Sequence, residues 1–360
     1  MSTSFFLVRW LYAAMNWVYT GMKSLFNASN GGWVVVLTIF LFTLGIKLVT
    51  VFSDVKSRKS SIQMQQIQPD LDKLKKKYGN DPQRLNTEQR KLMKERGVSS
   101  FGGCLPMLIM LPLLFMFFEA FRAWSNQQTL SLMIDIANGK GAETFASFRF
   151  LWITNIWRPD NLLGGGTLMK GSEFWSTFAA TNNVKNFIFY QNNANVLNEI
   201  LYKLHFFTIT TNESGAIEYV LANDGGLAFV KAYEAFVLPI TGNETLLGGA
   251  YESMSNGFAI LPLLAGATTF LSSWIMQKSQ PKPAEPDKKD QNDPAAQTQN
   301  MTKWMTYLMP LMSVFFCWRY DSTFAFYWIF SNIFSLAVTL IINATVVKKM
   351  QTEPMEVIKK

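Results

Sequence analysis

The stretch WVVVLTIFLFTLGIKLVT, residues 33–50, decides the fold of this chain, and its only charged side chain is Lys47. At about 1.5 Å per residue, a helix of this length crosses most of a hydrocarbon layer that is roughly 30 Å thick. A lysine deep in such a layer costs roughly 3 kcal/mol, so its ammonium reaches a membrane surface, pairs with another group or faces a water-filled cavity. The stretch therefore predicts a membrane span that carries one cation.

The neighbours of Lys47 help to choose among these outcomes. On a helix that turns by about 100° per residue, Thr43, Thr50 and Asp54 fall on the same face as Lys47. This polar stripe predicts a wet, cationic groove inside the membrane. The competing interpretation is that Lys47, which lies one turn from the end of the stretch, snorkels to the cytoplasmic surface.

The composition is typical of a polytopic membrane protein rather than of one soluble core, because 49% of the 360 residues are hydrophobic. The net charge is +8, and the basic residues gather beside apolar segments, where anionic lipid and the positive-inside rule account for them. We therefore expect no direct nucleic-acid function.

The chain has one histidine and two cysteines, and both cysteines lie in apolar segments. No metal site, cofactor or catalytic residue is expected from such a set.

Residues 1–32 form the first predicted part, an N-terminal amphipathic helix that lies in the membrane interface. Between residues 5 and 26 most side chains are aromatic or aliphatic, yet Arg9, Asn16 and Lys23 line up on one helical face. The segment is also long enough to cross the membrane as an additional span. The pattern leaves both alternatives open.

Residues 33–124 are predicted to hold the first two spans, with a charged helical hairpin at residues 53–100 between them. Within the hairpin, apolar residues recur at helical spacing on either side of the turn sequence GNDP, residues 79–82. Basic residues outnumber acidic ones there, which predicts a cytoplasmic position. The second span, residues 104–120, contains prolines, which membrane helices tolerate where neighbouring groups satisfy the freed backbone.

Residues 125–256 are predicted to form a small folded α+β domain outside the cytoplasm, because acidic residues outnumber basic ones in this insert. Alternating side chains in residues 206–221, around a Ser-Gly turn at 214–215, predict a β-hairpin. Residues 227–236 are expected to be helical. The asparagine-rich run at residues 191–195 is expected to be a surface loop.

Residues 257–347 are predicted to carry the last three spans and a cytoplasmic linker at residues 277–302, and residues 348–360 form a cytoplasmic tail. Five spans that start outside and end inside place every strongly basic loop in the cytoplasm. The predicted fold class is thus an all-α polytopic membrane protein. It has a core of five transmembrane helices, a cytoplasmic helical hairpin and an inserted small α+β extracytoplasmic domain.

Several sequence motifs, taken in this order, resemble the YidC/Oxa1/Alb3 family of membrane protein insertases. They are the single basic residue of the first span, the hairpin sequence IQPDLDKLKKKYGNDPQRLN, the second-span sequence FGGCLPMLIMLPLLFMFFEAF and the last-span sequence FYWIFSN. The stretch FLWITNIWRPDN, residues 150–161, adds to the similarity. The order and spacing of these motifs together make the resemblance specific.

The resemblance implies a bacterial plasma membrane protein whose five-helix core forms a hydrophilic groove, open to the cytoplasm and to lipid but closed on the outer side. The basic residue in that groove is usually arginine, and Lys47 keeps the positive charge but lacks the planar guanidinium. The family's Pro-Ala-Gly turn before the last span is replaced here by DST, residues 321–323. The groove residues that we expect from the polar stripe and the resemblance together are Lys47, Thr43, Thr50, Tyr327, Trp328, Asn332 and Ser335.

The expected function is that of a membrane protein insertase and chaperone, which is not an enzyme in the bond-making sense. A polar or acidic translocated segment would meet water and the Lys47 charge instead of hydrocarbon. Expected partners are nascent membrane proteins and the lipid bilayer, with the ribosome and the Sec translocon as further candidates. The N-terminus is expected outside and the C-terminus in the cytoplasm. The alternative is a channel or small-solute transporter, against which the lack of an inverted repeat counts.

Overall fold

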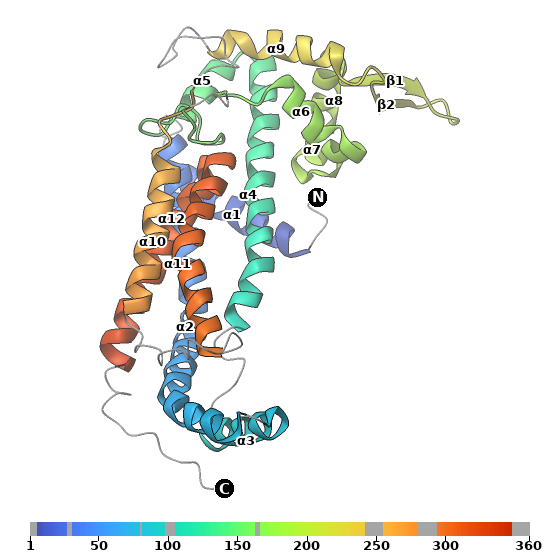
Figure 1. Cartoon of the computed structure of the whole chain (residues 1–360). Helices are drawn as coiled ribbons and strands as arrows, with labels where there is room; N and C mark the ends of the chain where they lie inside the picture. The colour runs from blue at the N-terminus through green and yellow to red at the C-terminus, as the bar shows by residue number, and fades with distance from the viewer. Residues whose placement is uncertain are drawn as a thin grey trace. The chain divides into compact units, whose positions relative to one another are not determined.

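The computed structural model is mostly helical and carries one small β-hairpin (Figure 1). It describes residues 6–26, 31–79, 81–97, 105–162, 166–241, 255–278 and 294–347. The predicted tail at residues 348–360 and most of the predicted linker at residues 277–302 lie outside these described residues.

The chain divides into two compact units, and several long helices contribute to both of them. The first unit comprises Met1–Phe42, Phe115–Leu264 and Val314–Tyr327. The second unit comprises Thr43–Leu114, Ala265–Ser313 and Trp328–Lys360.

Helix α1, Phe6–Leu25, has one buried apolar stripe and a second, exposed apolar surface. The stripe follows the spacing expected for one helical face, with Val8, Leu11 and Met15 buried. Trp10 and Trp17 are 61% and 79% exposed. Large exposed aromatic side chains of this kind fit the predicted position in a membrane interface, which stays a prediction.

Helix α2, Gly31–Tyr78, is one uninterrupted helix of 48 residues that continues from the predicted first span into the predicted hairpin. Its first two residues are glycines because the backbone of another segment comes close to them. A Cβ atom on Gly32 would lie 2.2 Å from the carbonyl oxygen of Arg149, and one on Gly31 would lie 2.6 Å from that of Ser147. Any larger residue here would push α2 away from residues 147–149.

The predicted turn at residues 79–82 is confirmed as the break between α2 and α3, Pro82–Glu95. The Asp81 side chain accepts a hydrogen bond of 3.0 Å from the backbone N–H of Arg84, and proline occupies the first helical turn. Both features are standard signals for a helix start. The two helices pack through Ile67 and Leu71 of α2, with Leu92 and Met93 of α3 beside them.

Helix α4, Leu105–Ala137, begins at the predicted second span and runs on into the insert. The rest of the insert is a set of short helices and the β1–β2 hairpin, which projects from the helices at one end of the first unit (Figure 1). Its elements are α5 Gly141–Ser147, α6 Gly171–Phe178, η2 Ala180–Asn186, α7 Ile188–Asn192, α8 Ala194–Lys203, β1 Phe207–Thr211, β2 Ile217–Leu221 and α9 Leu227–Thr241.

An aromatic cluster fills the core of the insert. Phe174 of α6 lies at the centre, with ring centroids of Phe178, Phe206, Phe229 and Tyr233 at 4.4, 5.7, 5.2 and 5.2 Å. All five side chains are buried. Aromatic side chains bury large areas and add favourable ring contacts, so this cluster stabilises the packing of α6 against α9.

The strands and α9 confirm the predictions for this region, whereas one prediction was wrong. β1 and β2 pair antiparallel from Phe207 opposite Leu221 to Thr211 opposite Ile217. The run at residues 191–195 is not a loop, because α7 and α8 cover it with a single break at Asn193. The Asn193 side chain donates to the carbonyl of Phe189 at 2.8 Å. This local hydrogen bond stabilises the junction between α7 and α8.

The last three long helices are α10, Ile260–Lys278, α11, Pro294–Arg319, and α12, Ser322–Ile342, and the short π-helical turn η3, Asn343–Val347, follows. Over the described residues, three helical segments are long and apolar enough to cross a membrane: Gly31–Lys56, Ile260–Lys278 and Ser322–Thr345. They correspond to the first, third and fifth predicted spans. The predicted spans in α4 and α11 remain predictions.

Candidate functional site

Lys47 and Ser335 lie 288 positions apart in the sequence and meet in the second unit. The Lys47 Nζ donates a hydrogen bond of 2.7 Å to the Ser335 Oγ, which joins α2 to α12. Both side chains are half-buried. No ion pair joins Lys47 to a carboxylate within the part of the chain that the structure describes. An ammonium carries three donors, so this bond leaves donor capacity for an anionic oxygen.

Trp328 and Asn332 lie seven and three residues before Ser335 on α12, and both donate hydrogen bonds to α10. The Trp328 Nε1 donates to the Thr269 Oγ1 at 3.0 Å, and the Asn332 Nδ2 donates to the same oxygen at 2.9 Å. A longer bond of 3.3 Å runs from the Asn332 Nδ2 to the Thr268 Oγ1. Three polar residues of α12 are therefore held by hydrogen bonds to two neighbouring helices of the second unit.

The two threonines predicted beside Lys47 differ in their surroundings. Thr43 is 1% exposed. Thr50 is half-buried, and its Oγ1 donates to the carbonyl of Lys47 at 3.4 Å, within the same helix. A hydroxyl that bonds its own helix can remain in an apolar environment at little cost. Of the two, Thr50 lies nearer to the Lys47–Ser335 contact along the chain and is the more accessible.

Tyr327 belongs to the first unit, where its ring is part of an aromatic stack. Its centroid lies 4.7 Å from that of Phe117 and 5.3 Å from that of Phe121. The side chain is buried at 9% exposure. The structure therefore gives Tyr327 packing contacts in the first unit, and it gives Lys47, Trp328, Asn332 and Ser335 polar contacts in the second.

Large apolar side chains of α2 and α12 surround the polar contacts without being covered by protein. Val49, Leu48 and Phe52 of α2 are 82%, 66% and 76% exposed, and Leu340 and Ile341 of α12 are also exposed. On a soluble protein so much exposed apolar surface marks an interface, and on membrane-spanning helices it faces lipid. The Lys47–Ser335 contact is thus a polar point within apolar helix surfaces.

A second ionic group lies in the first unit, in the motif stretch at residues 150–161. The buried Arg158 donates through both terminal nitrogens to Glu173 of α6, at 2.9 and 2.7 Å. Its backbone carbonyl accepts the N–H and the hydroxyl of Ser322 at 3.0 and 2.7 Å. Arg158 therefore ties the insert to the first residue of α12. Sequence reasoning singled out the motif but not this role.

Asp160 in the same stretch holds the start of α10. It is 0% exposed, and its carboxylate accepts the backbone N–H groups of Ala259 and Leu261 at 3.0 and 2.7 Å. The Trp152 Nε1 donates to the same carboxylate at 3.1 Å. These bonds satisfy donors at the helix N-terminus that would otherwise be buried without partners. The motif stretch thus anchors the first residues of both α10 and α12.

Two carboxyl groups near Arg158 have shifted pKa values, in opposite directions. Burial opposes the ionisation of Glu173, but the hydrogen bonds and charge of Arg158 outweigh it and lower the pKa of Glu173. Burial raises the pKa of Asp321 to about 6, although the charge of Arg158 and a hydrogen bond from Ser125 act against it. Glu173 is the ion-pair partner of the guanidinium, and Asp321 is a second carboxyl group near it whose ionisation is opposed by burial.

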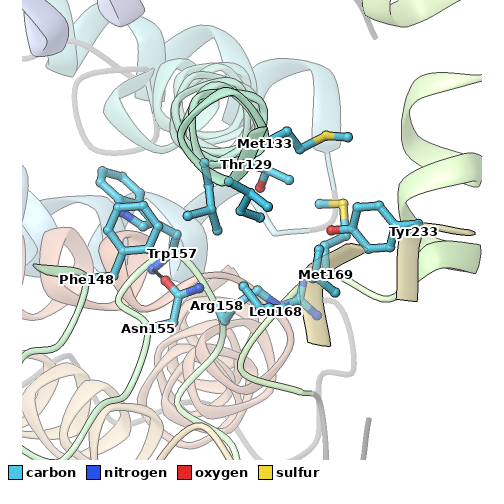
Figure 2. A pocket seen from close by; sticks show the side chains of 12 residues that line it. Thr129, Met133, Phe148, Asn155, Trp157, Arg158, Leu168, Met169 and Tyr233 are labelled. Atoms are coloured by element: carbon cyan, nitrogen blue, oxygen red, sulfur yellow. Dashed lines mark hydrogen bonds between the residues drawn. The ribbon is translucent and has the colours of Figure 1, made fainter. Parts of the chain in front are cut away.

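The cavity beside Arg158 is too small to be a ligand site. Its volume is about 10 Å³, close to the space that one water molecule needs. Figure 2 shows Met133 and Thr129 of α4 on one side of it and Trp157, Arg158 and Asn155 of the motif stretch on the other. Most of its lining is apolar. The cavity therefore belongs to the packing of the insert and does not compete with the Lys47 contact as the candidate site.

Thr268 and Thr269 are the site residues that sequence reasoning missed. A helical-face plot of α10 would have placed them together, but threonines are common in membrane helices and usually bond their own backbone. Both do so here, to the carbonyl of Ala265 at 3.1 and 2.7 Å. Only the approach of Trp328 and Asn332 distinguishes them, and that approach is a tertiary contact.

Comparisons with known proteins agree on one family. Residues 25–350 match the family model described as 60Kd inner membrane protein. A protein of Clostridium perfringens named Membrane protein insertase YidC is 37% identical over 125 residues, which is 35% of this chain and 45% of that protein. A Clostridium tetani protein of the same name is 36% identical over 148 residues, 41% of this chain and 58% of that protein.

A longer alignment reaches a more distant relative. The protein of that name from Chlorobium luteolum is 24% identical over 317 residues, which is 88% of this chain but 34% of the relative. The matches thus span between about a third and three fifths of the relatives' own lengths.

Proposed function

Because the chain belongs to the family of the 60Kd inner membrane protein, and therefore to a bacterial membrane, we propose that it is a membrane protein insertase, as the names of its relatives state for them. Three apolar helices of sufficient length support the location in a membrane. The proposal extends to a five-span core with the N-terminus outside and the C-terminus in the cytoplasm, as the distribution of basic residues predicts.

The observation that carries the proposal is the hydrogen bond between Lys47 and Ser335. Both residues come from helices that can span a membrane, and the ammonium is held by a neutral hydroxyl at 2.7 Å instead of by a carboxylate. A cation on a membrane-spanning helix that has no ion-pair partner among the described residues retains its attraction for anions. Such an arrangement favours transient binding of a substrate carboxylate over a permanent structural role for Lys47.

In the proposed mechanism the groove lowers the penalty for moving a polar segment through the membrane. An aspartate at the centre of a spanning helix costs roughly 3 kcal/mol, and water together with the Lys47 charge offsets part of it. Thr43, Thr50, Trp328, Asn332 and Ser335 keep the surroundings polar, whereas the ring of Tyr327 packs against Phe117 and Phe121. The apolar part of the substrate then leaves sideways into lipid. No covalent bond is made or broken.

The proposed partners follow from this route. The hairpin of α2 and α3 is rich in basic residues and lies on the cytoplasmic side in the proposed topology, so it meets the nascent chain first. The ribosome is a candidate partner on the cytoplasmic side, and the Sec translocon is a candidate partner within the membrane. The insert between α4 and α10 faces outward in the same topology.

The test is complementation of a bacterium whose own insertase is depleted. The insertion of a short membrane protein with an acidic translocated end is followed, together with that of a version whose acidic residues are neutralised. We expect Lys47→Arg to restore the insertion of both, Lys47→Glu to fail with the acidic version, and Lys47→Ala to insert the neutral version better than the acidic one.

Lys231→Glu is the matched control, because Lys231 is an exposed lysine of α9 that lies outside both the apolar segments and the basic hairpin. It should support insertion like the wild type. Full activity of Lys47→Glu with the acidic substrate would contradict the electrostatic mechanism. Insertion that continues unchanged without this chain would favour a channel or small-solute transporter.

A further inference from the structure

The hydroxyl of Thr269 uses its complete hydrogen-bonding capacity between α10 and α12. It donates to the carbonyl of Ala265 at 2.7 Å and accepts from the Trp328 Nε1 at 3.0 Å and the Asn332 Nδ2 at 2.9 Å. A hydroxyl has one donor and two acceptor lone pairs, so all three are occupied. Thr269 is 7% exposed. A fully used hydroxyl in a buried position fixes the geometry of both partners.

The same contacts fix which way the Asn332 amide points. Thr269 donates its hydroxyl hydrogen to the carbonyl of Ala265 at 2.7 Å, so its oxygen accepts from Asn332. The Nδ2 of Asn332 must therefore face α10. The remaining amide atom is a carbonyl oxygen, which repels a carboxylate. Asn332 thus holds α12 in place and is not the group that would solvate an acidic segment.

From these contacts we infer that Thr269 is a positioning residue, whose hydroxyl fixes the rotation of α12 and so keeps Ser335 within hydrogen-bond distance of Lys47. The inference rests on the proposed function, because it assigns a role within the same site. Trp328, Asn332 and Ser335 follow each other at spacings of four and three residues, so they form one stripe on α12.

The geometry makes this stripe sensitive to rotation. A rotation of α12 by about 20° moves an atom that lies about 5 Å from the helix axis by roughly 2 Å. A shift of that size would break the 2.7 Å bond between Lys47 and Ser335. α12 has hydrogen bonds to α10 on one part of the stripe and to α2 on the next. The ammonium and the serine hydroxyl can then act together as two donors for one carboxylate.

The test compares Thr269→Val, which keeps the shape and removes the hydroxyl, with Thr269→Ser, which keeps the hydroxyl. The full chain is expressed in insertase-depleted cells, and insertion is measured for the acidic substrate and its neutral version. We expect Thr269→Val to lower insertion of the acidic substrate about fivefold and that of the neutral version less than twofold. Thr269→Ser should behave like the wild type.

Thr345→Val is the matched control, because the Thr345 Oγ1 donates to the carbonyl of Ile341, four residues earlier, at 2.7 Å and does not join two helices. It should leave both substrates unaffected. An equal loss of both substrates in Thr269→Val, or no loss, would overturn the positioning role. If Thr269→Val does not accumulate in the membrane, Trp328→Phe removes one donor from the same hydroxyl, and the same preferential loss is expected, at about twofold.

A double variant tests whether Thr269 acts through Ser335. Ser335→Ala alone should lower insertion of the acidic substrate, and adding Thr269→Val should lower it no further, because the hydroxyl to be positioned is gone. Additive losses would overturn the inference. If Lys47→Glu inserts the acidic substrate normally, the proposed function fails. If the Lys47 variants behave as expected and Thr269→Val does not, only the positioning role fails.

Discussion

Two cations, the buried Arg158 and the half-buried Lys47, are held in opposite ways. Arg158 in the first unit binds both carboxylate oxygens of Glu173, at 2.9 and 2.7 Å. Lys47 in the second unit binds a neutral hydroxyl, that of Ser335, at 2.7 Å. A guanidinium and a carboxylate form a two-bond pair of fixed geometry, whereas an ammonium is a point charge that accepts many arrangements of oxygen.

This difference indicates that the Arg158 charge is structural. When one partner of a buried ion pair is removed, the other is left as an uncompensated charge, so such pairs are costly to break. A hydroxyl left without its ammonium costs far less, because it is neutral and can bond its own helix. We therefore expect the loss of Arg158 to affect the fold and the loss of Lys47 to affect the activity.

The largest effect is expected from Arg158→Met, which leaves Glu173 without its guanidinium. Because Glu173 keeps 41% of its side chain exposed, solvent screens part of the penalty, and we expect a loss of about 2 kcal/mol. Thermal unfolding of the purified protein in detergent should show a Tm lower by about 5 °C.

Lys203→Met is the control for this prediction. The pair between Lys203 and Glu199 also measures 2.7 Å, but both side chains are exposed, at 70% and 65%. Its removal should leave Tm unchanged. Equal losses in the two variants would remove the distinction between a buried pair and a surface pair.

Lys47→Met should show the reverse pattern. Among the described residues no carboxylate loses an ion-pair partner, so Tm should stay within about 1 °C of the wild type or rise, since a desolvated charge is gone. Insertion of an acidic substrate should fall about tenfold, which corresponds to about 1.4 kcal/mol, and that of the neutral version should change little. A fall in Tm as large as that of Arg158→Met would mean that Lys47 is structural after all.

The third prediction concerns the dependence of stability on pH. The pKa of Asp321 is raised to about 6 from 3.8, so the folded state binds this proton more tightly than the unfolded state does. Stability from this group should therefore rise as pH falls from 7 towards 4. The pKa of Glu173 is lowered from 4.5, so its stabilising effect is present above pH 4.5 and is lost as pH falls below that value.

Together these groups predict a stability maximum near pH 5, with a gain of about 1 kcal/mol between pH 7.5 and 5. The charged groups that act on Asp321 are Arg158, Glu173 and Arg122. Asp321→Asn should flatten the profile between pH 5 and 7.5 and leave the fall below pH 4.5 in place. The measurement is Tm of the wild type and of Asp321→Asn across this pH range. If Tm of Asp321→Asn depends on pH as the wild type does, the gain between pH 7.5 and 5 comes from another group.

Much of the fold could be predicted from the sequence because local signals determine it. Three of the predicted spans, the turn before α3 and the β1–β2 hairpin all follow from periodicity and from turn residues that lie next to each other. The absence of a break in α2 could not be predicted in the same way, since the change from apolar to polar residues near residue 53 looks like a boundary. A helix continues through such a change when no residue interrupts its hydrogen bonds.

The candidate site could be predicted only as a set of faces. Helical spacing placed Lys47 on a polar stripe, and the resemblance pointed to Trp328 and Asn332. Neither could show that the Lys47 partner is Ser335 or that the partners of Asn332 are Thr268 and Thr269, because those contacts join positions 288 and 63 or 64 residues apart. The partner of a polar residue depends on how the helices pack. The sequence of one helical face does not identify the residues of the neighbouring helix that contact it.

The DST turn before α12 shows the same limit. Sequence reasoning marks it only as a departure from the family's pattern. In the structure, Ser322 starts α12 and binds the Arg158 carbonyl through both its N–H and its hydroxyl. A proline or an alanine at that position would lose one or both bonds, so the departure and the Arg158 contact belong together.

The smallest effect is expected from Asp54→Asn. This variant tests whether the charge of Lys47 acts on the substrate or is paired with Asp54. Asp54 lies two turns along the same face of α2, about 10 Å along the axis, and its charge attracts that of Lys47. Removing it should strengthen the attraction of Lys47 for a substrate carboxylate and raise insertion of the acidic substrate by up to about twofold.

Glu213→Gln removes an equal charge from the exposed turn between β1 and β2 and should change nothing. The ratio of acidic to neutral substrate inserted is the measurement, because a general effect on folding cancels in it. If Asp54→Asn lowers this ratio, Asp54 and Lys47 act as a pair, and Lys47 would then resemble Arg158. A ratio that rises while Tm stays constant would place the two cations in separate classes, one that holds the fold and one that meets the substrate.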